Sequence, residues 1–291
     1  MGYSWIKPTN WYNNFRINAN AYYSRRLNPG TYQNANFNIN ANGQLKNLWS
    51  VGSMIGYEPE NNNFYEPRVA GKVFRGWSNY FTSMWFETNN AKKYKLYSEL
   101  FYAKRNLFSS ERYSFDFNQR YRFNNNLTIS QGISLSPQRN NVGFAGLEGS
   151  EVVFGKRDIK TIENTLNIKY SFNANMNINT RIRHYWSNVK YNDFFTLQND
   201  GSLEENSTYN ENKNQNLNFF NIDMVYTWQI APGSFVNVVW KNAVTDFRQI
   251  TVDSYFKNLN NTMKIEDNNN ISFKIIYFLD YLQLKNFKKK K

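Results

Sequence analysis

This sequence contains few kinds of side chain that could act in catalysis or bind a metal ion. The 291 residues include a single histidine, His184, and no cysteine. A catalytic triad that depends on histidine would have to use His184, and zinc sites need several histidine or cysteine ligands. The cysteine count also excludes disulfides and thiolate metal sites. We therefore expect no catalytic residue, no metal site and no cofactor, and we interpret His184 as an interfacial residue near a strand end.

Carboxylates occur beside basic residues along much of the chain. Glycoside hydrolysis would need two carboxylates that face one sugar at about 5 to 10 Å, and no spacing identifies such a pair. The acidic, asparagine-rich stretch 200–216 lacks the ligand spacing of an EF-hand loop. We interpret the charged residues instead as the lining of a polar interior, where they need partners. The candidates are Glu99, Asp116, Arg120, Arg122, Glu163, Lys169, Arg181, Arg183, Asp223, Lys241, Lys274 and Asp280.

The composition favours a β-sheet that has lipid on one face and water on the other. Aromatic residues make up 18% of the chain, yet the mean hydropathy is −0.73 and asparagine is abundant. A sheet with one face in lipid and the other in water needs this combination, because every second residue must be apolar. No apolar run approaches the roughly 18 residues of a spanning helix. If the chain crosses a membrane it does so with strands, since hydrocarbon tolerates only helices and closed barrels.

The net charge of +13 comes from Lys and Arg residues scattered over the whole length. Basic residues interleaved with aromatic residues could bind nucleic acid. In this sequence, however, the rings fall mostly on one face of the expected strands and the basic residues on the other. We therefore expect solvated loops and lumen-facing cations, with lipid phosphates nearby, and no nucleic-acid partner.

Alternation of apolar and polar residues is the dominant pattern. The clearest segment places six apolar residues on one face: Phe220, Ile222, Met224, Tyr226, Trp228 and Ile230. Similar segments cover 113–123, 160–173 and 271–281. The exceptions are Val225 on a polar face, and Gln119 and Asn164 on apolar faces. Soluble strands usually have about 5 to 6 residues and tilted spanning strands about 9 to 11, so these lengths favour a transmembrane barrel.

Short and long connections are expected to alternate between these segments. Asn, Gly and Pro residues predict short turns at 41–44, 89–92, 124–126, 173–175 and 231–234. Longer polar connections are expected at 58–77, 137–159, 188–215 and 249–268, and brief ones at 28–30 and around Ser109. Short turns on one side and long loops on the other are typical of outer-membrane barrels. Counting from Trp11 gives about twelve strands, with the short turns and the carboxy terminus on the periplasmic side.

Aromatic residues near the short turns are expected to form a girdle at the membrane interface, where an amphipathic ring is stable at the headgroup level. The candidates are Tyr94, Phe123, Phe172, Trp228, Phe235 and Tyr281. Tyr102 and Trp186 are expected nearer the opposite ends of their strands.

Several strand and turn segments carry a family resemblance. Residues 219–234 followed by 239–242, together with 77–86 and 271–281, resemble the carboxy-terminal part of a Bacteroidota-type outer-membrane family of unknown function. Members of that family combine an amino-terminal carbohydrate-binding domain, of the family-nine type, with a long barrel-like region. The resemblance implies no chemistry for residues of this chain, and the sugar-binding domain has no counterpart in it.

The amino terminus lacks the basic and apolar regions of a secretory signal. Together with the resemblance to a longer barrel, this leads us to expect that residues 1–291 form one barrel domain, as the carboxy-terminal fragment of a larger protein. The chain would then have strand edges that need further partners.

We therefore predict an all-β protein, an antiparallel transmembrane β-barrel of about twelve strands that lies in the outer membrane, alone or as part of a larger barrel. The expected function is envelope transport or surface binding without enzymatic activity. Outer-membrane lipid is the expected partner, and a glycan is a candidate ligand. Two alternatives stay open: a structural barrel that anchors an upstream domain, and a soluble all-β carbohydrate-binding protein.

Overall fold

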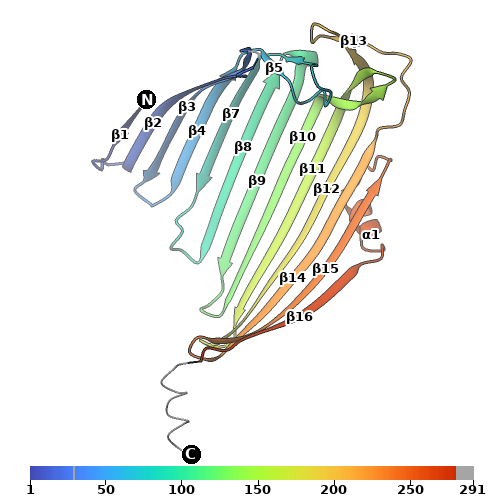
Figure 1. Ribbon diagram of the computed structural model, residues 1–291. Coiled ribbons are helices and arrows are strands. Elements are labelled where there is room, and N and C mark those ends of the chain that lie inside the picture. Colours follow the sequence, from blue (N-terminus) through green and yellow to red (C-terminus); the bar gives the residue numbers. More distant parts are fainter. Residues whose placement is uncertain (29, 280–291) are drawn as a thin grey trace, which may run out of the picture.

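The computed structural model describes residues 1–28 and 30–279, and almost all of its regular structure is β-strand (Figure 1). One large antiparallel sheet follows the order of the chain. Its path is β1 (Gly2–Trp5), β2 (Tyr12–Arg25), β3 (Tyr32–Leu45), β4 (Ser50–Glu58), β7 (Asn79–Glu87), β8 (Tyr94–Arg105), β9 (Ser110–Arg122), β10 (Leu127–Glu148), β11 (Glu151–Ser171), β12 (Met176–Leu197), β14 (Gln215–Ala231), β15 (Ser234–Arg248) and β16 (Asn268–Ile276). β13 (Leu203–Glu205) pairs with β12, and β5 (Asn61–Asn63) pairs with β6 (Phe74–Gly76) in a separate sheet. The predicted all-β class is confirmed.

The number and the length of the strands follow from the alternating segments. From β2 onward the path contains twelve strands, the number expected when counting from Trp11. β1 lies before them, where no strand was expected. The shortest of the twelve have nine residues and the longest have 22, so each reaches the length of about 9 residues that a tilted strand needs to cross a bilayer.

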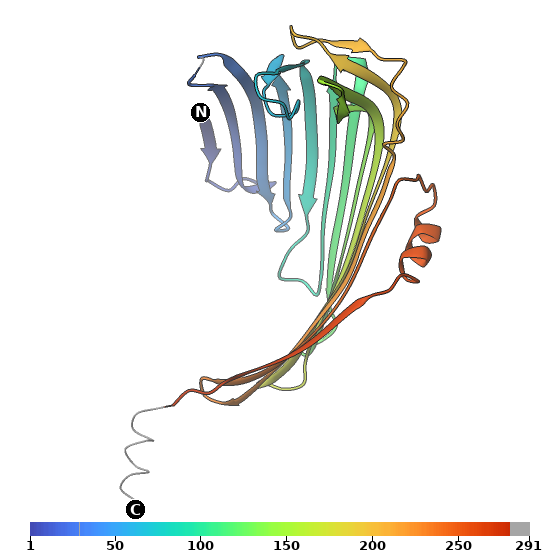
Figure 2. The ribbon, with the colours of Figure 1, turned by 45° about the vertical axis from the view of Figure 1, so that its right-hand side comes forward.

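The sheet curls into a trough, and Figure 2 shows its concave and convex sides. Within the described residues β1 and β16 each have a neighbour on one side only. The sheet is therefore open, and no closed barrel is formed in this part of the chain. The expected edge strand at 15–23 is a further difference, because β1 pairs with it, with Tyr3 opposite Ile17, and is itself the edge.

Connections differ between the two ends of the sheet (Figure 1). One end, which we call the short-turn end, has the connections 6–11, 46–49, 88–93, 123–126, 172–175 and 232–233. The other, which we call the connection end, has three long connections that carry structure of their own, and its short connection 106–109 contains the 3-10 helix η1 (Leu107–Ser109). The long ones are 59–78 with β5 and β6, 198–214 with β13, and 249–267 with α1 (Tyr255–Thr262). The predicted asymmetry is confirmed, as are four turns, at 89–92, 124–126, 173–175 and 231–234.

The turn predicted at 41–44 is wrong. Those residues lie inside β3, and the chain turns at 46–49 instead. Within β3, Gly43 allows the backbone of Asn14 to come close: a Cβ atom at position 43 would lie 2.8 Å from the backbone oxygen of Asn14. In the actual turn, Leu48 adopts the left-handed conformation with a φ of 64°.

Two predicted long connections are also wrong, wholly or in part. The stretch 137–159 is strand, because β10 and β11 continue through it with two register shifts and meet in a tight turn at Gly149. β12 extends to Leu197, which reduces the connection expected at 188–215 to 198–214. In the first stretch, glycines and a proline hide the alternation, and the β-bulges absorb the resulting irregularity.

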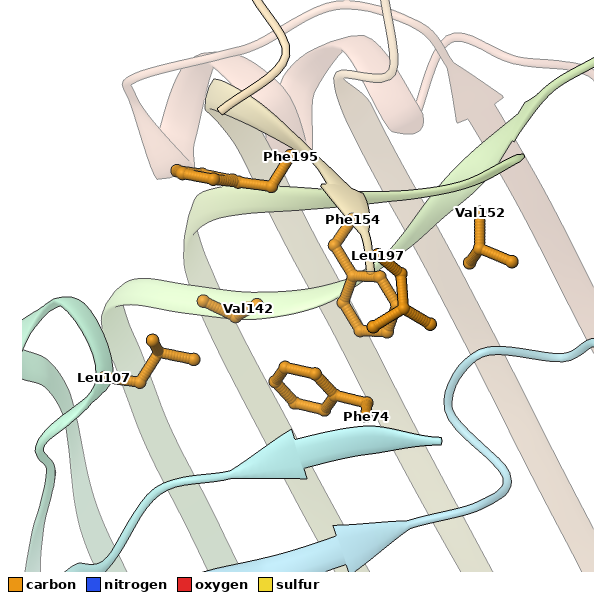
Figure 3. Packing of buried hydrophobic residues seen from close by; sticks show 7 residues of the cluster. All are labelled: Phe74, Leu107, Val142, Val152, Phe154, Phe195 and Leu197. Carbon is orange, nitrogen blue, oxygen red and sulfur yellow. The ribbon is translucent and has the colours of Figure 1, made fainter. Parts of the chain in front are cut away.

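Residues 59–78, which we call the strap, cross the connection end of the trough. The Asn62 side chain donates to the Tyr32 backbone oxygen (3.0 Å), and the Arg75 N–H donates to the Gly201 backbone oxygen (2.9 Å). Between these anchors, buried apolar side chains join the strap to the sheet (Figure 3). They are Phe74, Leu107, Val142, Val152, Phe154, Phe195 and Leu197. This apolar core therefore lies at one end of the sheet.

The helix α1 packs on the convex side of the sheet (Figure 2). It begins after Ser254, whose side chain accepts a hydrogen bond from the Lys257 N–H (3.4 Å), as an N-cap residue does. The helix has eight residues. None of the helices in the described residues is long and apolar enough to span a membrane.

Candidate functional site

The register assigns the side chains to two faces of opposite character, because residues directly opposite in antiparallel strands point to the same face. From β7 to β12 one row of partners reads Trp85, Glu99, Asp116, Ser134, Glu163 and Tyr185. The adjacent row on the other face reads Met84, Leu100, Phe115, Leu135, Ile162 and Trp186. The ring of Trp186 contacts Tyr255 of α1, so the apolar face is convex and the polar face is concave.

The apolar face is broad and largely uncovered. Between 59% and 72% of the surface is exposed for Ile55, Met84, Leu100 and Phe273. On β11 the apolar positions run from Ile162 to Tyr170, roughly 27 Å at about 3.4 Å per residue. Tilted by about 40°, a strand of that length covers roughly 20 Å of the apolar band of about 25 Å around an outer-membrane barrel.

Charged and phenolic side chains bound the apolar band toward the connection end. There the same face carries Lys104, Glu111, Arg139 and Lys160 on four neighbouring strands. Tyr102 and Tyr113 lie just inside this boundary, and both hydroxyls donate to the Glu111 carboxylate (3.1 and 3.0 Å). Rings with one polar atom at a charged boundary are the arrangement found at membrane interfaces.

Rings bound the band toward the short-turn end. Of the predicted girdle residues, Tyr94, Phe123, Phe172 and Trp228 lie there. Tyr94 is paired with Tyr121, whose ring lies 4.6 Å from that of Phe123. Phe235 differs, because it pairs with Gln229 and so lies on the polar face. The remaining candidate, Tyr281, lies outside the described residues.

A row of carboxylates crosses the middle of the polar face. Glu99 lies opposite Asp116, and Glu163 follows two strands further on. The Tyr97 hydroxyl donates to Glu99 (2.6 Å). Arg183 donates to both oxygens of Glu163 through Nε and Nη2 (3.0 and 2.8 Å), the two-point geometry that gives an arginine–carboxylate pair its specificity.

A hollow of about 580 Å³ opens on the polar face beside this row. Hydroxyl and amide groups line much of it, with charged residues of both signs among them: Lys95, Asp116, Arg120 and Glu163. This volume lies in the range of about 300 to 1,000 Å³ that holds small molecules. The hollow thus offers hydrogen-bond donors and acceptors to a polar solute.

The other lumen-lining candidates lie on the polar face toward the short-turn end. They are Arg120, Arg122, Lys169, Arg181, Asp223, Lys241 and Lys274. Asp223 is placed between Arg181 and Lys241 on the neighbouring strands. The register thus brings the described candidates to one face, while Asp280 lies outside the described residues.

The expectation that His184 is an interfacial residue near a strand end is wrong, because His184 lies well inside β12 and α1 covers it. It is buried under α1, with Nδ1 3.0 Å from the Tyr255 hydroxyl and Nε2 3.4 Å from Oδ1 of Asn218. Asn258 of α1 bonds to Asn218, and Asn164 donates to the Tyr255 hydroxyl (2.7 Å). The helix therefore covers polar residues that interrupt the apolar face. The Ser254 cap was one local signal that could have located the helix.

In the described part of the chain, no group of three or more histidine, aspartate or glutamate side chains is arranged to hold a metal ion. Among curated proteins, none matches this chain. A family profile matches residues 1–288, and its description names neither an organism group nor a sugar-binding domain. The chain therefore belongs to a family described as a domain of unknown function, DUF5916.

Proposed function

We propose that this sheet is the wall of an integral outer-membrane β-barrel, which carries or binds polar solutes at its concave face. The observation that carries this proposal is the uncovered apolar band on the convex face, with rings at both of its limits. In water so large a band would drive association. In a bilayer it is the surface that lipid solvates, with its rings at the two interfaces.

The concave face supports the same proposal. Its carboxylates, cations, hydroxyls and amides line the trough, and a polar interior is typical of outer-membrane barrels. In lipid, however, an open strand edge leaves backbone groups unsatisfied at several kcal/mol each. The proposal therefore requires that β1 and β16 be paired in the membrane, with each other or with further strands.

The orientation follows from the connections. In outer-membrane barrels the short turns face the periplasm and the longer loops face outward. We place the strap and the connection 198–214 at the cell surface, and the short turn 88–93 in the periplasm.

Cysteine labelling tests this placement directly. Ser202 and Ala91 are exposed positions at the connection end and the short-turn end. An impermeant thiol reagent applied to intact cells should label Ser202→Cys and leave Ala91→Cys unlabelled until the cells are broken. Labelling of both variants on intact cells would overturn the placement.

Sedimentation separates the proposal from a soluble all-β carbohydrate-binding protein. The chain should sediment with outer membranes and need detergent for release, because the apolar band must stay covered. Recovery of the folded chain in the supernatant without detergent would refute the membrane proposal.

A second candidate, a structural barrel with a closed interior that anchors another domain, is favoured by the strap. This segment crosses the connection end and is held there by a buried apolar cluster. Reconstituted protein that binds to bilayers without conducting ions would support the structural barrel. Conducting channels would support a solute pathway along the polar face.

A further inference from the structure

Cations dominate the polar face toward the short-turn end. We call the set Arg120, Arg122, Lys169, Arg181, Lys241 and Lys274 the basic zone. Its members come from five strands, and the register brings like charges close together. Arg120 lies directly opposite Lys95, and a single residue, Thr128, separates Arg122 from Lys169. Like charges so placed repel one another unless a counter-charge lies between them.

The protein supplies little of that counter-charge. Among the described residues no member of the basic zone has a carboxylate within the 4.0 Å of an ion pair. Glu87 is paired with Lys95 (2.5 Å), and Glu163 with Arg183 (2.8 Å). In the described strands Asp223 is the one carboxylate aligned with the zone by register, opposite Arg181 and Lys241.

The hydrogen bonds of the two arginines on β9 show the same lack of negative charge. The Arg120 Nη2 donates to the backbone and side-chain oxygens of Asn90 (2.8 and 2.9 Å), which are neutral acceptors. Its Nε is buried and has no hydrogen-bond partner in the structure. Arg122 reaches only the backbone oxygen of Lys92 (3.5 Å). The guanidinium groups therefore keep their full charge and part of their donor capacity.

The zone is accessible from the trough. Arg122, Lys169, Arg181, Lys241 and Lys274 are exposed, and Arg120 lines the hollow on the polar face. The carboxylates Asp116 and Glu163 line the other side of that hollow, toward the connection end. The sign of the field therefore changes along the polar face, from mixed charge in the middle to positive at the short-turn end.

We propose that the basic zone makes the polar pathway selective for small anions, which it concentrates as mobile counter-charges. This inference rests on the proposed membrane barrel and names the class of solute that its interior favours. A cleft lined by one sign of charge between low-dielectric walls raises the local concentration of the opposite ion. Inorganic phosphate, with more charge than chloride, should be held more tightly by the same cations.

The reversal potential of the protein in a planar bilayer tests the inference. Under a potassium chloride gradient we expect a several-fold preference for chloride over potassium, and added inorganic phosphate should lower the chloride current. Replacing three cations of the zone (Lys169→Gln, Arg181→Gln and Lys241→Gln) should move the reversal potential toward zero and weaken the effect of phosphate.

A control removes the same charge elsewhere. Lys104, Lys190 and Lys257 are exposed, and they lie on the convex face or on α1. Their replacement by Gln should leave the selectivity unchanged, because salt screens exposed charges beyond about 10 Å. Equal shifts in both triple variants would refute the role of the zone.

The outcomes distinguish this inference from the proposed function. Channels that prefer potassium, or that show no preference, would overturn the anion inference and leave the membrane barrel intact. Membrane insertion without any conductance would overturn both the anion inference and the solute pathway. Failure to insert would overturn the membrane barrel itself.

Discussion

The same strands form both faces of the sheet, yet the two faces accommodate exceptions differently: polar residues on the apolar face and aromatic rings on the polar face. On the convex face Gln119 is paired with Gln131 (2.9 Å), and Asn164 is covered by α1. On the concave face the Trp85 ring lies against Gly52, where a Cβ atom would come within 2.5 Å of it. Polar residues on the apolar face thus require partners, whereas rings on the polar face require room.

This difference shows what each face must satisfy. A polar group without a partner is costly in an apolar environment, so the convex face allows few exceptions and pairs them. The concave face is lined with groups that water can solvate, so its side chains can vary if the backbone register is kept. The predictions below probe that contrast, beginning with the largest expected effect.

An arginine on the convex face should be the most damaging change. Met224→Arg should lower the free energy of unfolding in lipid by about 2 to 4 kcal/mol if the position lies near the midplane of the bilayer. The neighbouring Asp223→Asn, on the concave face, should change it far less. Urea titrations of both variants in vesicles provide the measurement. Equal losses would mean that alternation does not separate lipid from water.

The sequence predicted the strand number and the two faces from period-two alternation, and the short-turn end from its Asn, Gly and Pro residues. It failed where a contact distant in sequence decides the backbone. Gly43 looked like a turn residue, but it is needed for the approach of Asn14. In β10 the expected loop is strand, because Asn140, with a φ of 50°, is held at a bulge by Asp158 (2.9 Å).

The prediction of the candidate site was limited in a similar way. Alternation assigned the charged candidates to one face, but it could not show which of them pair. The Arg183–Glu163 pair joins residues on adjacent strands that are not directly opposite. The burial of His184 depends on a helix 71 residues away along the chain. Neither arrangement has a local signature.

Removing a partner under α1 should be the second largest effect. Asn258 is 1% exposed and bonds to both Asn216 and Asn218. Asn258→Ala would leave the buried Nδ2 of Asn216 without a partner, at about 1 to 3 kcal/mol, whereas Asn218 would keep Asp246 and His184. Asn260→Ala, at an exposed position of the same helix, is the matched control. Hydrogen exchange of α1 and thermal unfolding should report the loss for the first variant only.

Adding a methyl group under a ring on the concave face should cost less. A Cβ atom at Gly56 would overlap the Phe81 ring, and overpacking costs about 1 to 3 kcal/mol. We expect the lower end of that range for Gly56→Ala, because the ring can move into the trough. Gly132→Ala is the control, since its Cβ atom would meet the flexible end of Asn118. Equal unfolding free energies for the two variants would show that Phe81 is free to shift.

The smallest effect should come from the ion pair on the concave face. Arg183 and Glu163 form a two-point contact, but their side chains are 34% and 33% exposed. Pairs open to water contribute about 0.2 to 1 kcal/mol, and they weaken as salt is added. A double-mutant cycle with Glu163→Gln and Arg183→Gln isolates the coupling between the two charges. A coupling in this range that falls with salt supports a concave face filled with water. A coupling of several kcal/mol, insensitive to salt, would mean that the interior is dry and packed, as in a structural barrel, because desolvation makes the loss of one buried charged partner far more costly.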